Sequence, residues 1–203
     1  MSQDLCGNCG TPLVPRTRAG RTWPGCPTCR DLWPNPKTLA LVHRHRRPPP
    51  PNTTLSLTYE PNGTEHHDLV LRLGTWANRS DSYYYALDHA GGRRPDVVRS
   101  LRALLTHWAT ALTGCADGQA VLLPHAFHDQ ATGWLRCVRS GDTFHVEDGW
   151  SALEGWAIYP SDYAERAQGL TDFQPAPGFG PPLAIACTRL LADVQASLAA
   201  ASP

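Results

Sequence analysis

Two pairs of cysteines constrain the fold of this 203-residue chain more than any other feature of its sequence. Cys6 and Cys9 form the first pair and Cys26 and Cys29 the second, with 16 residues between the pairs. The two thiolates of a Cys-x-x-Cys pair lie on one side of a tight turn, and two such pairs joined by a hairpin supply four soft ligands for a tetrahedral ion. The spacing therefore predicts a small zinc ribbon with one structural Zn²⁺ bound by all four thiolates.

Two other interpretations of the four cysteines remain open. Iron in a rubredoxin-like arrangement would use the same ligands, and two disulfides would be typical of a small secreted domain. The first six residues contain neither the basic start nor the apolar stretch of a secretory signal. We therefore expect a cytoplasmic protein with reduced thiols. Because protein ligands would fill all four positions, the predicted role of the metal is structural.

The residues around the cysteines form a recognisable pattern. The first pair lies in Cys6-x-x-Cys9-Gly10-x-Pro12-Leu13-Val14-x-Arg16, and the second pair follows Gly20-x-x-Trp23-x-Gly25-Cys26. This pattern covers about 25 of the 203 residues and resembles the zinc ribbons at the C-termini of bacterial type I topoisomerases. Those ribbons bind single-stranded DNA, although the gap between their last two cysteines is usually longer. The resemblance implies a nucleic-acid surface with Trp23 stacking on a base and with phosphate contacts from Arg16, Arg18 and Arg21.

Charge is divided unevenly along the chain. The first 51 residues hold eight basic and two acidic side chains, whereas the rest hold ten basic and sixteen acidic ones. A basic segment containing Arg44, Arg46 and Arg47 precedes four consecutive prolines, which favour an extended spacer. We expect a ribbon over 1–42, a linker over 43–52 and a main domain over 53–203. The basic arm would contact single-stranded nucleic acid, a protein partner or the acidic main domain of its own chain.

Hydrophobic periodicity predicts an α+β fold for the main domain, with an antiparallel sheet packed against two main helices. The Asn-Gly dipeptide at 62–63 indicates a hairpin between strands at 53–59 and 66–73. Helical spacing runs from Val97 to Leu112, with Gly114 ending the helix, and again from Leu183 to Leu198. Further strands are expected at 82–87, 121–123, 132–139 and 143–147, whereas 150–159 is ambiguous.

The strongest candidate for catalysis is the segment that contains His125, His128 and Asp129. The sequence predicts a loop there. If these three side chains shared protons or bound a metal ion, the protein would be a hydrolase. The chain contains no nucleophile elbow, no phosphate-binding glycine loop and no His-Glu-x-x-His helix. We therefore expect no enzyme and infer no small-molecule substrate. Three further cysteines are expected as small buried apolar residues, namely Cys115, Cys137 and Cys187.

The sequence thus favours a non-catalytic zinc-ribbon protein that recognises a macromolecular partner, either a protein or single-stranded nucleic acid. No apolar run reaches the length needed to span a bilayer, so we expect no membrane partner. The alternative is an immunity-type inhibitor, because short strands around one long helix with acidic loops loosely resemble the small immunity proteins that neutralise bacterial toxins. An exposed patch of Asp142, Glu147 and Asp148 would favour that alternative.

The metal site generates the first prediction. Purified, reduced protein should contain one zinc ion per chain, and Cys9→Ser should release it and unfold the ribbon. Residues 53–203 should stay folded in that variant, because the proline-rich linker separates the two parts. Elemental analysis measures the metal and circular dichroism measures the fold. Absence of metal from carefully reduced wild-type protein would contradict the prediction.

Overall fold

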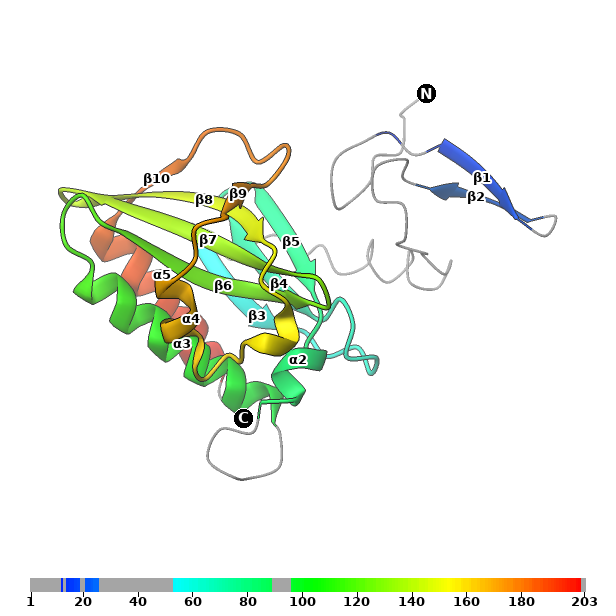
Figure 1. Ribbon diagram of the computed structural model, residues 1–203, viewed down its shortest axis with the longest axis horizontal. Helices are drawn as coiled ribbons and strands as arrows, with labels where there is room; N and C mark the ends of the chain where they lie inside the picture. The colour runs from blue at the N-terminus through cyan, green and yellow to red at the C-terminus, as the bar shows by residue number, and fades with distance from the viewer. Residues whose placement is uncertain (1–11, 13, 19–20, 26–52, 89–95, 202–203) are drawn as a thin grey trace. The chain divides into compact units, whose positions relative to one another are not determined.

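The computed structural model describes residues 12, 14–18, 21–25, 53–88 and 96–201, and it divides the chain into two compact units, Met1–Pro51 and Asn52–Pro203 (Figure 1). The four predicted zinc ligands lie outside the described residues, as do the linker arginines Arg44, Arg46 and Arg47. In the described part of the chain, no helix is both long enough and apolar enough to cross a membrane.

The first unit contains an antiparallel hairpin of β1 (Val14–Arg18) and β2 (Arg21–Gly25). Pro15 lies directly opposite Pro24. In an antiparallel ladder, every second pair of opposed residues is not hydrogen-bonded, and its N–H groups point away from the partner strand. Two prolines at such a pair remove no hydrogen bond of the ladder. They also leave both outer edges without a donor at this point, which disfavours pairing with a further strand.

The second unit contains two antiparallel sheets. The smaller sheet has the order β3-β4-β5, and the larger has the order β10-β8-β7-β6 with β9 also paired to β8. The smaller sheet comprises β3 (Leu55–Tyr59), β4 (Leu69–Leu73) and β5 (Trp76–Ser80). The larger comprises β6 (Ala120–His128), β7 (Ala131–Ser140), β8 (Thr143–Ser151), β9 (Gln174–Pro175) and β10 (Leu183–Ala186).

Two long helices pack against each other and against the sheets: α3 (Val97–Gly114) and α5 (Cys187–Ala200) (Figure 1). Asp96 caps α3, because its carboxylate accepts hydrogen bonds from the backbone N–H groups of Val98 and Arg99. The predicted apolar stripe of α3 is buried through Leu101, Leu104, Leu105, Trp108 and Leu112. Shorter helices complete the unit, namely α2 (Tyr83–Ala86), η1 (Gly155–Ala157) and α4 (Tyr163–Gln168). The predicted α+β class is confirmed.

Several predicted elements were wrong in detail. Residues 83–86 form helix α2 and not a strand, and Leu183–Ala186 forms strand β10 and not the first turn of the last helix. Residues up to His128 belong to β6 and not to a loop. Nor does a two-residue turn follow β3: the Asn62 carboxamide accepts from the Thr64 N–H and donates to the His66 carbonyl, which stabilises a wider loop.

Helix α5 covers the edge of the smaller sheet. The Asp193 carboxylate accepts hydrogen bonds from the backbone N–H groups of Thr54 (2.8 Å) and Leu55 (2.9 Å), and the Ser197 hydroxyl accepts one from Leu57 N–H (3.3 Å). Asp193 and Ser197 are each only 5% exposed. The outward N–H groups of β3 would otherwise form an open edge able to pair with another chain. The helix therefore replaces a missing neighbouring strand with side-chain acceptors.

This edge generates the second prediction. Asp193→Ala should lower the free energy of unfolding by about 2–5 kcal/mol, because the buried Leu55 N–H and the partly buried Thr54 N–H lose a charged acceptor and Arg189 loses its ion pair. Asp193→Asn should cost less, since its amide oxygen can still accept. Urea unfolding measures the change, and Gln195→Ala, at an exposed position of the same helix, is the matched control. Equal stability of Asp193→Ala and the control would refute the role of Asp193.

Candidate functional site

The register of the β1–β2 hairpin gathers the predicted nucleic-acid contacts. Arg16 lies opposite Trp23, and Arg18 lies opposite Arg21. Opposed residues of an antiparallel ladder lie on the same face, and so do residues two apart along a strand. Positions 16, 18, 21 and 23 therefore share one face of the ladder. Three arginine positions and one tryptophan position thus fall on a single face, which the sequence pattern alone did not show.

The same register bears on the predicted metal. It pairs Val14 with Gly25, so the strand ends that connect to the two cysteine pairs lie side by side. Cys26 directly follows Gly25 in the sequence, and Cys9 precedes Val14 by five residues. Both pairs therefore attach to the same end of the hairpin, which fits a closed site of four thiolates. Among the described residues of the whole chain, no group of three or more metal-binding side chains could hold an ion.

His125 lies in the interior of the second unit, with 1% of its surface exposed. Its Nε2 is 2.8 Å from the Oδ1 of Asp148 in β8, and the second oxygen of that carboxylate accepts a hydrogen bond from Trp76 Nε1 at 2.8 Å. Asp148 is itself only 2% exposed. One buried carboxylate therefore connects β8 with β6 of the larger sheet and with β5 of the smaller one.

A β-bulge explains how His125 reaches this position. The pairing of β6 with β7 shifts between Pro124 and Ala126, which leaves His125 outside the ladder. Its free carbonyl accepts hydrogen bonds from the hydroxyls of Ser80 and Tyr85, both at 3.2 Å. His125 is therefore bound at its ring and at its backbone, and it connects the two sheets within the interior.

His128 and Asp129 lie apart from this network, at the turn between β6 and β7. Both are exposed, and Asp129 accepts a hydrogen bond from the buried Tyr84 hydroxyl. Burial of Tyr84 and the nearby Asp129 carboxylate raise the pKa of that phenol, which therefore stays a donor. The partner of His125 is Asp148 and not Asp129, so the structure does not bring the three residues of the hydrolase hypothesis together in one site.

The pKa of His128 is lowered from its usual value of about 6.5, chiefly because neighbouring atoms displace water around the ring. The nearby carboxylates of Asp81 and Asp129 raise the pKa of His128, whereas His125 and His67 lower it further. The imidazole is therefore neutral at pH 7. These neighbours come from the loop before β4, the turn before α2 and the β6–β7 turn, which therefore lie close together.

Aromatic side chains surround this turn. The His66 ring stacks on Tyr83 with 6.5 Å between ring centroids, and Tyr83 contacts Tyr84 edge-on at 5.3 Å. On the other side, η1 packs so closely that a Cβ on Gly155 would lie 2.6 Å from the His128 backbone nitrogen. The next residue, Trp156, is 59% exposed. We call this surface the aromatic end, comprising His66, Tyr83, Tyr84, His128, Asp129 and Trp156.

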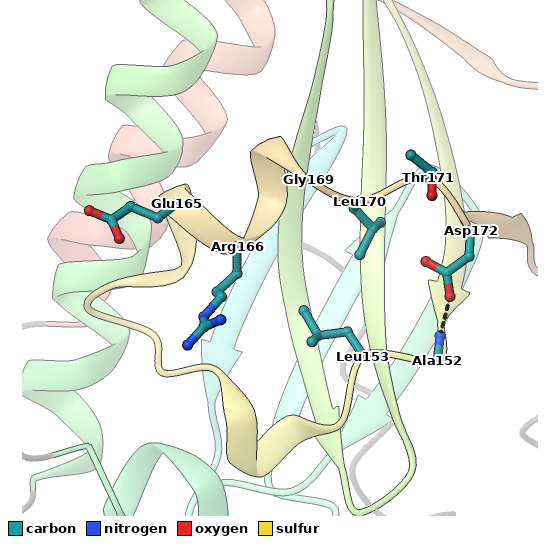
Figure 2. Close-up of a pocket in the computed structure, with 8 residues that line it drawn as sticks. All are labelled: Ala152, Leu153, Glu165, Arg166, Gly169, Leu170, Thr171 and Asp172. Atoms are coloured by element: carbon teal, nitrogen blue, oxygen red, sulfur yellow. Dashed lines mark hydrogen bonds between the residues drawn. The ribbon is translucent and has the colours of Figure 1, made fainter.

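A shallow pocket of about 490 Å³ also lies on the second unit (Figure 2). Leu153 and Leu170 project into it, and the Asp172 carboxylate accepts a hydrogen bond from Ala152 N–H at 2.8 Å. The remaining lining residues are Glu165, Arg166, Gly169 and Thr171. The pocket contains neither His128 nor any other histidine or cysteine, so it lacks the groups that the hydrolase hypothesis requires.

The carboxylate patch considered for an inhibitor is also not formed. Asp148 is buried, and Glu147 forms an ion pair with Arg136 at 2.9 Å. Of the three residues only Asp142 is exposed. Cys115 and Cys137 are buried as predicted, and burial raises the pKa of both thiols, whereas Cys187 is partly exposed.

Comparisons with models of protein families, with curated proteins and with solved structures found no match to this chain.

The lowered pKa of His128 generates the third prediction. Well above pH 6.5 the ring is neutral in the folded and unfolded chains, so its protonation has no effect on stability. As the pH falls below 6.5 the unfolded chain binds the proton first, so the free energy of unfolding should decrease until the folded pKa is passed. His128→Gln should reduce that decrease, and Gln195→Ala, which removes no titratable group at an exposed position of α5, should not. Equal pH profiles for His128→Gln and wild type would contradict the shift.

Proposed function

We propose that this chain is a non-catalytic binding protein that holds single-stranded nucleic acid on one face of its zinc-ribbon hairpin. The observation that supports the proposal is the ladder register, which assigns Arg16, Arg18, Arg21 and Trp23 to a single face. Arginine is the preferred contact for phosphate, because its planar guanidinium donates several hydrogen bonds and is always charged. An aromatic ring stacks on any base and contributes about 1–3 kcal/mol per base.

The metal gives this small surface its stability. A two-stranded hairpin by itself is at best marginally stable in water. Four thiolates on one Zn²⁺ would join the strand ends beside Val14 and Gly25 and so hold the binding face in one conformation. Arg44, Arg46 and Arg47 of the linker would add up to three further phosphate contacts. In the second unit the three residues of the hydrolase hypothesis do not form one site, since His125 pairs with Asp148 and not with Asp129.

The test moves arginine side chains from one face of the β1–β2 hairpin to the other without changing the amino-acid composition of the protein. The paired substitution Arg16→Thr with Thr17→Arg moves one arginine to the opposite face, and Arg21→Thr with Thr22→Arg moves a second. Affinity for a labelled oligothymidine should fall in each swapped variant, and the log–log dependence on salt should become shallower by about 0.7 for each phosphate that the protein no longer neutralises. Fluorescence anisotropy of the full chain measures both quantities.

Two further variants complete this prediction. Trp23→Ala should weaken binding of the oligothymidine by about 5- to 150-fold, the range that corresponds to the loss of one stacked base. Arg166→Ala removes an exposed arginine from the second unit and should leave binding unchanged. Swapped variants that bind like wild type would show that net charge alone, and not a face of the hairpin, attracts the strand. Absence of binding at low salt would refute the proposed function.

A further inference from the structure

The aromatic end of the second unit has the chemistry of a cation-binding surface. Trp156 and Tyr83 are 59% and 43% exposed, and Tyr159, three residues after Trp156, is 37% exposed. Tyr83 lies in α2, whereas Trp156 and Tyr159 lie in and just after η1. Both segments contact the β6–β7 turn, through Tyr84 and through Gly155. We infer that this surface binds an arginine- or lysine-rich segment of a partner protein, with aromatic faces and carboxylates acting on the same cations.

The position of each aromatic residue follows from specific contacts. Tyr83 is held by a hydrogen bond from its N–H to the Glu65 carbonyl at 3.2 Å and by the stacked ring of His66. Trp156 is held by η1, whose Gly155 packs on the His128 backbone. The Asp88 carboxylate then connects α2 to the segment after η1, because it accepts hydrogen bonds from the N–H (2.9 Å) and the hydroxyl (2.8 Å) of Ser161. Figure 1 shows α2 beside the yellow turn of η1 at one end of the sheets.

The chain segments at this end contain acidic residues and no basic ones, and Arg72 and Arg79 reach Glu60 from the neighbouring strands β4 and β5. The four segments, residues 60–68, 81–88, 128–131 and 152–162, contain no lysine or arginine. They contain eight acidic residues, and the six that are not buried are Glu60, Glu65, Asp81, Asp129, Glu154 and Asp162. Glu60 is neutralised by Arg72 and Arg79, each at 3.1 Å. Within the described part of the chain, the Glu65 and Glu154 carboxylates form no hydrogen bond or ion pair, so they remain available to a cation.

The exposed aromatic side chains and the nearby carboxylates together favour a positively charged partner. A guanidinium or ammonium group is attracted to the face of an exposed tryptophan or tyrosine, and adjacent carboxylates add direct ion pairs. An anionic partner such as nucleic acid would be repelled by the same carboxylates, and a purely apolar partner would bury them without compensation. A basic peptide segment is therefore the occupant that the surface fits.

Hydrogen bonds within the protein preorganise this surface for binding. Asp81 accepts a hydrogen bond from the His67 N–H at 2.8 Å and lies 3.0 Å from His66 Nδ1, which fixes the loop that carries Glu65. That loop holds Glu65 and His67 at positive φ, at 58° and 56°, a backbone conformation that non-glycine residues adopt rarely. Little ordering is then required on binding, which favours affinity. This role concerns the second unit and is independent of the nucleic-acid function proposed for the first.

The experiment titrates full-length protein into a fluorescein-labelled octa-arginine peptide at low and at physiological salt. Trp156→Ala should weaken binding about 5- to 30-fold, the range that corresponds to one cation–π contact with its surrounding packing, whereas Trp156→Phe should restore most of the affinity. Glu154→Gln should weaken binding several-fold and reduce the salt dependence. Asp142→Asn, which removes an exposed charge at the opposite end of the larger sheet, should bind like wild type.

Three results would overturn the inference. The first is no binding of the peptide by wild-type protein at low salt. The second is equal weakening by Asp142→Asn and Glu154→Gln, which would show attraction to overall charge and not to this surface. The third is a wild-type dimer, seen by analytical ultracentrifugation, that dissociates in Trp156→Ala, because a second copy would then be the occupant. The hairpin swaps that test the first unit leave these residues unchanged, so the two proposals can fail separately.

Discussion

The second unit depends on one buried carboxylate. Asp148 lies in β8, and its two oxygens contact the ring of His125 in β6 and the indole of Trp76 in β5. A carboxylate removed from water is costly unless both oxygens are bonded, so the three residues stabilise the structure only as a set. Because β5 belongs to the smaller sheet, this set determines where the two sheets meet. The bulge at His125 then gives its carbonyl to Ser80 and Tyr85, which reinforces the same junction.

Three other aspartates are also buried and hydrogen-bonded, so they do not add to the negative charge of the surface. Asp68, Asp88 and Asp193 are also buried, and each bonds to donors far away in the sequence. The unit's sixteen acidic residues therefore include four that support the fold, which leaves twelve near the surface against ten basic residues. The acidic excess of the sequence is largely internal. What remains is concentrated locally at the aromatic end, and a sum over the sequence cannot reveal such a concentration.

The sequence predicted those features that depend on local spacing. The helix from Val97 and the strands at 132–139 and 143–147 were predicted correctly, because the periodicity of their own residues determines them. Tyr83–Ala86 was assigned to a strand because tyrosine favours strands, but the side chain of Asp68 bonds to Ser82 and begins a helix there instead. The roles of His125 and Asp148 depend on contacts 23 residues apart, which no pattern in one sequence encodes. The zinc ligands remain a prediction from spacing, and the shared face of the hairpin required the ladder register.

The turn between β6 and β7 shows how a single segment serves both the interior and the surface. His125 is directed inward by the bulge, whereas His128, three residues later, lies at the surface with a lowered pKa. Because His128 is neutral at pH 7, it adds no positive charge beside Asp81 and Asp129, and the negative potential of the aromatic end is preserved. A histidine with an elevated pKa at this position would partly cancel that potential.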